Sequence, residues 1–306
     1  MTPAAIELEP DVGSAAGRLF VVATPIGNLG DITLRAVEVL RSVDVIAAED
    51  TRLTRRLLDR HAISTPMVSY HARSGPGRLR ELVERLERGE DVALVTDAGT
   101  PGVSDPGDEL VDAWLRDGGT AVPIPGPSAV VVAVSATAIA GPRWSFEGFL
   151  PRGGAERRER IARIAADARG TVLYEAPGRI VATLLDLAAA CGAERPAAVC
   201  RELTKLHEEI VRATLGELAD RARSGELTLR GEFVIVVGAR AASDAISGAA
   251  AGAADDDRLA AALAEVERQV AAGSPRGQAA RDVAASTGVP RRRLYAAPDR
   301  AAGRDR

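Results

Sequence analysis

The stretch DVALVTDAGTPGVSDPG, residues 91–107, joins an apolar segment to a glycine-rich loop and gives the strongest indication of the fold in this 306-residue chain. The run up to Thr96 consists of small apolar side chains, which predicts a buried strand. Thr96–Gly107 then holds three glycines and two prolines. Glycines let a backbone approach a ligand closely, and the N–H groups they expose can hold polar atoms. We expect this loop to bind a small molecule, whereas Asp105 before Pro106 is expected to cap the next helix.

Apolar runs alternate with helical patterns on both sides of this stretch. This alternation implies a parallel or mostly parallel sheet that helices cover on both faces. The expected strands are Arg18–Thr24, Val43–Ala48, Asp91–Thr96 and Ala121–Ile124, and the expected helices are Asp31–Leu40, Thr51–Arg60, Gly77–Arg88, Pro106–Arg116 and Ser128–Ala138.

The pattern breaks between Ala140 and Gly154, and a second α/β set follows. Because the helix between its last strands is short, part of this second sheet is expected to be antiparallel. The expected strands are Thr171–Tyr174, Ala197–Arg201, Glu208–Ala213 and Glu232–Val237, and the expected helices are Glu156–Ala168, Arg179–Ala190 and Leu215–Arg223.

These patterns predict an α/β protein of two α/β lobes and a small C-terminal helical module. The expected parts are a disordered leader (1–17), an N-terminal lobe (18–140), a C-terminal lobe (141–239), an Ala/Gly/Ser-rich linker (240–254) and a helix-turn-helix-like module (255–300).

Charge is distributed unevenly along the chain. Residues 274–306 hold eight arginines and three aspartates, a net +5, which leaves −9 for the rest of a chain of net charge −4. Such asymmetry suggests an anionic partner for the tail. A helical cap with a solvated arginine face explains the pattern equally well.

Composition excludes several other classes of protein. No apolar run reaches the roughly 18 residues of a membrane span, and the N-terminus lacks a secretory signal pattern. The two cysteines and three histidines have no metal-ligand spacing, so we predict no metal site. A cytoplasmic location is expected.

Ligands of open α/β sheets bind beyond the carboxyl ends of the strands. Two further loops there, Thr24–Asp31 and Pro125–Ala129, should therefore neighbour Thr96–Pro101. In the second lobe, Tyr174–Arg179 and Arg201–Glu209 also follow strands. The last segment is dense in ionisable groups and contains Lys205, the only lysine among 39 basic residues, which suggests proton handling.

Together these segments resemble the tetrapyrrole methylase superfamily, and within it the enzymes that methylate a ribose 2′-oxygen of a decoding-centre cytidine in small-subunit (16S) ribosomal RNA. The matching segments, in order from Leu19 to Val237, are VATPIGNLGDITLRAVEVL, AAEDTR, VSYH, TDAGTPGVSDPG, PGPSA, FEGFLPR, LYEAPGRI, RELTKLHEEI and GEFVIVV. The basic helical tail also resembles the C-terminal module of these enzymes.

The resemblance implies a fold of the tetrapyrrole methylase type, with S-adenosylmethionine bound in a cleft between the two α/β lobes. It also implies a homodimer, with ribosomal RNA or the small ribosomal subunit as partner. It implies additional cofactor contacts from the Phe149–Leu150 stretch. The chain departs from the family pattern after Pro151, where residues 153–155 dilute the basic side chains, and the basic residues that remain there for RNA contact are Arg152, Arg157, Arg158 and Arg160. The implied cofactor-binding residues are Pro25, Gly27, Asn28, Asp97, Gly99, Thr100, Pro101, Ser128, Ala129 and Tyr174.

The implied reaction transfers a methyl group directly to a ribose 2′-oxygen, a weak nucleophile that needs a base or a cation nearby. The candidate catalytic residues are Lys205, Glu202 and Glu175, with Glu208 as a fourth. Lys205 would serve as the cation, or as the base if burial lowers its pKa.

Two other readings stay open at the level of the sequence. The chain could be a methyltransferase of the same superfamily that acts on a tetrapyrrole or corrin precursor, although the basic tail would then be unnecessary. It could also be a non-catalytic ribosome-binding protein that uses the fold as a scaffold. Binding of S-adenosylmethionine would separate the enzymes from the scaffold.

Overall fold

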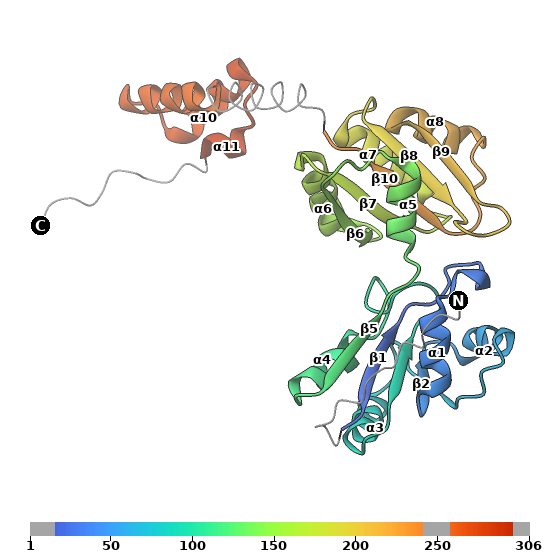
Figure 1. Ribbon diagram of the computed structural model, residues 1–306. Helices are drawn as coiled ribbons and strands as arrows, with labels where there is room; N and C mark the ends of the chain where they lie inside the picture. The colour runs from blue at the N-terminus through green and yellow to red at the C-terminus, as the bar shows by residue number, and fades with distance from the viewer. Residues whose placement is uncertain (1–15, 241–257, 296–306) are drawn as a thin grey trace, which may run out of the picture. The chain divides into compact units, whose positions relative to one another are not determined.

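The computed structural model describes residues 16–240 and 258–295 (Figure 1). Nearly all of the expected leader and linker, and the last residues of the expected tail, lie outside this range. The chain divides into two compact units at Ala239/Arg240, and each is described by itself. No helix of the described residues is long and apolar enough to cross a membrane.

The first sheet of the larger unit is parallel throughout and has the strand order β3-β2-β4-β1-β5. Its strands are β1 (Arg18–Val22), β2 (Val45–Ala48), β3 (Met67–Ser69), β4 (Val92–Val95) and β5 (Thr120–Ile124), and the helices that connect them are α1 (Leu34–Ser42), α2 (Thr51–Arg60), α3 (Pro76–Glu87) and α4 (Asp108–Arg116).

Alternate side chains of the central strands supply two separate cores. Phe20 and Val95 belong to the cluster that α1 covers, whereas Leu19 and Leu94 belong to the one that α3 and α4 cover. Burial on both faces explains why these strands are apolar without a break. The parallel, doubly covered sheet expected from the sequence is confirmed.

The second sheet is mixed and has the order β6-β7-β10-β8-β9, with only β6 and β7 parallel. The expected antiparallel part is therefore confirmed. Its strands are β6 (Trp144–Phe149), β7 (Gly170–Glu175), β8 (Pro196–Arg201), β9 (Glu209–Thr214) and β10 (Phe233–Val237), and the helices α6 (Gly154–Ala166), α7 (Ile180–Cys191) and α8 (Leu215–Ser224) supply the core on one face.

The other face of this sheet is covered by α5 (Ala129–Thr137), as Figure 1 shows. Val130 and Ala133 of α5 are buried against Val172 of β7 and Val234 of β10. The helix that we expected to end the N-terminal lobe thus packs on the second sheet. The lobe boundaries themselves stay a prediction.

The smaller unit is helical in its described residues, with helices at 258–271, α10 (Arg276–Thr287) and α11 (Arg291–Tyr295). Small side chains form its core, among them Ala262, Ala279 and Ala280, with Val266 and Leu294.

One expected helix start is wrong. Asp31, where we expected the first helix to begin, instead ends a short 3₁₀ turn (Leu29–Asp31), and Thr33 caps α1 by accepting from the Ala36 N–H. The Asn28 side chain accepts from the Gly30 N–H, and the turn so formed delays the helix by three residues.

Candidate functional site

Two backbone hydrogen bonds fold the loop after β4 back onto the loop after β1. The Thr24 N–H donates to the Gly99 carbonyl at 2.8 Å, and the Gly99 N–H donates to the Thr24 carbonyl at 3.1 Å. The Thr24 hydroxyl adds a bond to the Thr96 carbonyl at 3.0 Å. Gly99 has a φ of +85°, a backbone angle that residues with a Cβ rarely adopt. This bridge places the residues after Gly99 at the carboxyl edge of the sheet.

A cavity of about 320 Å³ lies at this edge, between loops of the two sheets. Its volume falls in the range of small-molecule sites. Six of the predicted site residues line it, namely Gly99, Thr100, Ser128, Ala129, Tyr174 and Glu175, together with Ile26, Ala98, Val103, Ser104, Asp105, Phe149, Ala176, Pro177, Leu203, Gly231, Glu232, Phe233 and Val234.

Five predicted cofactor residues lie outside the cavity lining, and three of them are Pro25, Pro101 and Asp97. Pro25 and Pro101 are buried outside the cavity lining. Asp97 joins two loops, because its carboxylate accepts from the Asp50 N–H at 2.9 Å and its own N–H donates to Glu49 at 3.3 Å. Burial raises the pKa values of both Asp97 and Glu49. The charge of Asp97 adds to the rise at Glu49, whereas hydrogen bonds from the Asp97 N–H to Glu49 and from the Asp50 N–H to Asp97 oppose the two shifts.

Gly27 and Asn28 contact the loop after β8 instead of the cavity. The Asn28 N–H donates to the Thr204 hydroxyl at 3.2 Å. A Cβ on Gly27 would lie 2.4 Å from Cγ of Lys205, so glycine is needed for the lysine to cross it. These two residues therefore join the two halves of the site.

The lone lysine sits between two carboxylates. Its Nζ lies 3.0 Å from an oxygen of Glu202 and 3.0 Å from one of Glu232. Burial of Lys205 opposes its charged form, but the bonds to Glu232 and Glu202 outweigh this and raise its pKa. The structure thus contradicts a low-pKa lysine base. Neither Lys205 nor Glu202 lines the cavity, whereas Glu232 does.

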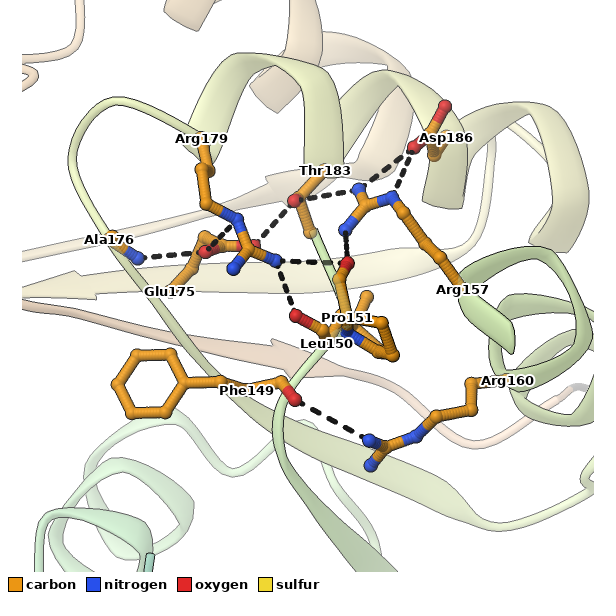
Figure 2. A network of polar contacts seen from close by, with 10 residues as sticks. All are labelled: Phe149, Leu150, Pro151, Arg157, Arg160, Glu175, Ala176, Arg179, Thr183 and Asp186. Carbon is orange, nitrogen blue, oxygen red and sulfur yellow. Dashed lines mark hydrogen bonds and ion pairs between the residues drawn. The ribbon is translucent and has the colours of Figure 1, made fainter. Parts of the chain in front are cut away.

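Glu175 lines the cavity, but its carboxylate is engaged and its side chain has no exposed surface. It accepts from the Thr183 hydroxyl at 2.5 Å and from the Ala176 N–H at 2.8 Å, and it pairs with Arg179 at 3.0 Å (Figure 2). These three donors occupy the carboxylate oxygens from within the protein. Its contacts suit a structural role.

Two of the arginines considered for RNA contact belong to the same network. Arg157 is 8% exposed and bonds to Asp186, to the Thr183 hydroxyl and to the Pro151 carbonyl. Arg160 pairs with Glu147 at 2.9 Å. Figure 2 shows the Arg157 guanidinium facing Thr183, Asp186 and the Pro151 carbonyl, and that of Arg160 facing the Phe149 carbonyl. Because these two side chains bond within the protein, RNA contact in this segment stays a prediction that the exposed Arg152 and Arg158 fit better.

Asp105 is the site residue that the sequence analysis assigned elsewhere. The helix α4 begins only at Asp108, with Gly107 as its N-cap at a φ of +140°, so Asp105 does not cap it. Its half-buried carboxylate lines the cavity, and among the described residues no hydrogen-bond or ion-pair partner reaches it. Burial and the nearby carboxylates of Glu49, Asp97 and Glu232 raise its pKa to about 7.

Such a carboxylate can accept a proton near neutral pH, since a base works best when its pKa matches the working pH. Tyr174, on the same wall, cannot do so, because burial and then the charge of Asp105 raise its pKa to about 12. The cavity thus combines an apolar surface, bare backbone at Gly99 and one free base. It suits transfer of a group to a weak oxygen nucleophile.

Residues 18–219 match the family model of the tetrapyrrole (corrin/porphyrin) methylases. The chain is 44% identical over 279 residues to a ribosomal RNA small subunit methyltransferase I of Synechocystis, covering 91% of this chain and 96% of that one. It is 42% identical over 285 residues to the protein of the same name from Xylella fastidiosa, covering 92% and 99%.

Solved structures share the fold at lower identity. A cobalt-precorrin-4 methyltransferase of cobalamin biosynthesis has a TM-score of 0.57 at 18% identity, over 72% of this chain and 94% of that one. The uroporphyrin-III C-methyltransferase of Thermus thermophilus, complexed with S-adenosylhomocysteine, has a TM-score of 0.53 at 21% identity, over 72% and 97%. These likenesses confirm the two-lobed α/β fold.

Replacing Arg157 by Leu is expected to lower the free energy of unfolding by about 1–3 kcal/mol, because the buried Thr183 hydroxyl and the Pro151 carbonyl each lose a donor. Replacing the exposed neighbour Arg158 by Leu should change it by less than about 0.5 kcal/mol. Urea denaturation measures both. Equal effects of the two variants would contradict a structural role for Arg157.

Asp105→Asn is expected to raise the free energy of unfolding at pH 8 and to leave it little changed near pH 4. The folded pKa of about 7 lies above the ordinary value of 3.8, so the folded chain binds a proton that the unfolded chain has lost between these values. The contribution of Asp105 to the stability of the wild type therefore falls as the pH rises from 3.8 to about 7. Thermal melts of both proteins from pH 4 to 8 test it, and a constant difference between them would contradict it.

Proposed function

The chain belongs to the tetrapyrrole methylase family, among the proteins named ribosomal RNA small subunit methyltransferase I, and we propose that it methylates small-subunit ribosomal RNA with S-adenosylmethionine as methyl donor. The observation that carries the proposal is the identity of 42–44% to relatives of that name, over more than nine-tenths of each chain. The cavity with its free base supports it independently.

The proposed target is the ribose 2′-oxygen of a cytidine at the decoding centre of 16S RNA. A ribose hydroxyl holds its proton tightly, so its methylation gains from a base that removes the proton during attack. Asp105 supplies a base of suitable pKa on the cavity wall. The resemblance of the segments RELTKLHEEI and LYEAPGRI supports the finer target.

The cavity residues suit the methyl donor. S-adenosylmethionine, when bound, supplies an electrophilic methyl group on a positively charged sulfur. Apolar side chains such as Ile26 and Val103 suit its uncharged parts, and the Asp105 and Glu232 carboxylates suit its charge. Gly99 lines the cavity, and its positive φ of +85° explains why a glycine stands there. We propose Gly99, Thr100, Ser128, Ala129 and Tyr174 as the residues that hold it.

Asp105 is the proposed catalytic base. As the bond forms between the 2′-oxygen and the methyl carbon, the carbon–sulfur bond breaks and its electron pair stays on sulfur. The hydroxyl proton passes to a carboxylate oxygen of Asp105. In-line alignment at about 3 Å is the main requirement of such a step. Ser128 begins α5 without capping it through its side chain, so its hydroxyl is available to help orient a ligand.

Lys205 and Glu202 are proposed to position Glu232 on the cavity wall, where its carboxylate keeps the pKa of Asp105 raised. Glu202 also accepts from the Glu232 N–H at 2.9 Å. Glu175 is proposed to hold the loop after β7 in shape. Asp105 is then the proposed base, and Lys205 is proposed as a positioning residue.

The remaining proposals concern assembly and place. We propose that the protein acts as a homodimer on the small ribosomal subunit in the cytoplasm. Leu34 and Leu206 are 80% and 94% exposed, which supports a protein contact over these side chains, since burying an apolar side chain of this size is favourable.

The direct test supplies the purified protein with labelled S-adenosylmethionine and small ribosomal subunits that lack the modification. Nucleosides from digested RNA are then separated by mass. We expect label in 2′-O-methylcytidine. Transfer only to a corrin or porphyrin precursor, or binding of subunits without binding of the methyl donor, would overturn the proposal.

Asp105→Asn is expected to lower kcat by roughly 10²- to 10⁴-fold, the usual contribution of a general base, with little change in affinity for S-adenosylhomocysteine. In the wild type, kcat/KM should rise with pH through about 7, because the carboxylate must lose its proton before it can act. The exposed Asp59→Asn serves as the control. An unchanged pH profile in Asp105→Asn would exclude Asp105 as the base.

Lys205→Met is expected to lower kcat by roughly 5- to 10-fold, the factor that about 1 kcal/mol of lost positioning produces. The rise of kcat/KM with pH should move to lower pH or broaden. The reason is that Glu232, which helps to keep the pKa of Asp105 raised, is no longer fixed near it. Full methylation at an unchanged profile, with intact cofactor binding, would remove Lys205 from the site.

A further inference from the structure

Phe149 is the one large apolar side chain of the described cavity lining that is half exposed, with 50% of its surface accessible. Its ring is tilted by 60° against that of Tyr174, with centroids 5.5 Å apart, and Tyr174 in turn contacts Phe146 edge-on at 4.9 Å. One face of a small aromatic cluster is therefore presented to the cavity. In a chain with only 3% aromatic residues, such a surface is uncommon.

The strand that carries this ring is held by its backbone. Arg179 donates to the Leu150 carbonyl at 2.6 Å, and Arg157 donates to the Pro151 carbonyl at 3.1 Å. Arg160 donates to the Phe149 carbonyl at 3.4 Å and to that of Glu147. Figure 2 shows the guanidinium groups gathered on one side of the segment and the Phe149 ring pointing away from them.

This arrangement fixes the position of an exposed apolar ring, and covering such a ring is favourable because it removes apolar surface from water. Three charged side chains that anchor neighbouring carbonyls leave the segment little freedom to turn the ring inward. Fixed geometry of this kind is what a binding surface requires, since a ligand then loses less entropy on binding. A flat heteroaromatic ring is the natural cover for one face of a phenyl group.

Two flat rings would enter this site in the proposed reaction, the adenine of the methyl donor and the base of the target nucleotide. A free cofactor can be enclosed at depth, where Gly99, Thr100 and Ala129 line the wall that carries Asp105. A target base remains attached to its RNA and must be received at an exposed edge. Phe149 is half exposed on the wall of the second sheet, and the exposed Arg152 follows it three residues later.

We propose that Phe149 is the stacking platform for the nucleobase of the target nucleotide, held in place by Arg157, Arg160 and Arg179. The inference rests on the proposed function and extends it. A stacked base, turned out of its RNA, would bring its ribose over the cavity. Stacking is tolerant of the base type, so Phe149 would position the nucleotide while other groups select it.

The experiment compares Phe149→Ala, Phe149→Leu and Phe149→Trp with the wild type. Phe149→Ala is expected to lower kcat/KM for RNA by roughly 10- to 100-fold, the effect of losing one base–aromatic stack. Phe149→Leu keeps apolar volume without a π face and should be similarly impaired, whereas Phe149→Trp should retain activity. Leu115→Ala, which removes a side chain 52% exposed on α4, is the matched control and should have no effect.

A second readout does not depend on methyl transfer. A short RNA with a single fluorescent cytosine analogue at the target position should be quenched by the wild type and by Phe149→Trp, but not by Phe149→Ala. Calorimetric affinity for S-adenosylhomocysteine should be the same in all variants. Failure of the wild type to methylate RNA would refute the proposed function while the quenching still tests Phe149.

Three results would overturn the inference. Loss of S-adenosylhomocysteine affinity in Phe149→Ala, with quenching retained, would assign the ring to the cofactor. Full activity of Phe149→Leu would show that apolar volume suffices. Equal quenching by the wild type and Phe149→Ala would show that the base lies elsewhere.

Discussion

The bridge between Thr24 and Gly99 is the constraint on which the rest of the site depends. The two residues follow different strands, and their exchanged backbone hydrogen bonds turn the loop after β4 across the carboxyl end of the sheet. Without that turn, Thr100 and Asp105 would continue outward from the strand. The parallel sheet makes the bridge possible, because β1 and β4 are neighbours that end at the same edge.

The second wall of the cavity is rigid for a different reason. On the first sheet the backbone bonds to itself, whereas on the second sheet arginine side chains bond to backbone carbonyls and to Glu175. Lys205 joins the two walls, since its stem crosses Gly27 and its ammonium group holds Glu202 and Glu232. Most charged side chains of the site thus fix the positions of its loops. Among the described residues that line the cavity, the one carboxylate without a hydrogen-bond or ion-pair partner is that of Asp105.

The sequence predicts most of the fold and about half of the site. Strongly apolar strands such as β4 and β10 are evident from composition alone, because both of their faces are buried. Two strands escaped prediction. Met67–Ser69 has only three half-buried residues, and Trp144–Phe149 has a register shift near Gly148, whose φ is +59°.

The site residues that were misassigned depend on contacts between distant segments. An aspartate before a proline has the local pattern of a helix cap, and only the carboxylates of Glu49, Asp97 and Glu232 give Asp105 its raised pKa. Arg157 and Arg158 are equivalent in local sequence, yet one is buried and the other exposed. Gly27 looked like a ligand-binding glycine, but its missing side chain makes room for Lys205.

A crystal structure of the protein with S-adenosylhomocysteine tests the central claim most directly. The account predicts the ligand against Gly99, Thr100 and Ala129, with its sulfur facing the Asp105 carboxylate across a space that admits one ribose oxygen. The Phe149 ring should remain uncovered by the adenine. A ligand bound outside this cavity, or one whose sulfur points away from Asp105, would contradict the account.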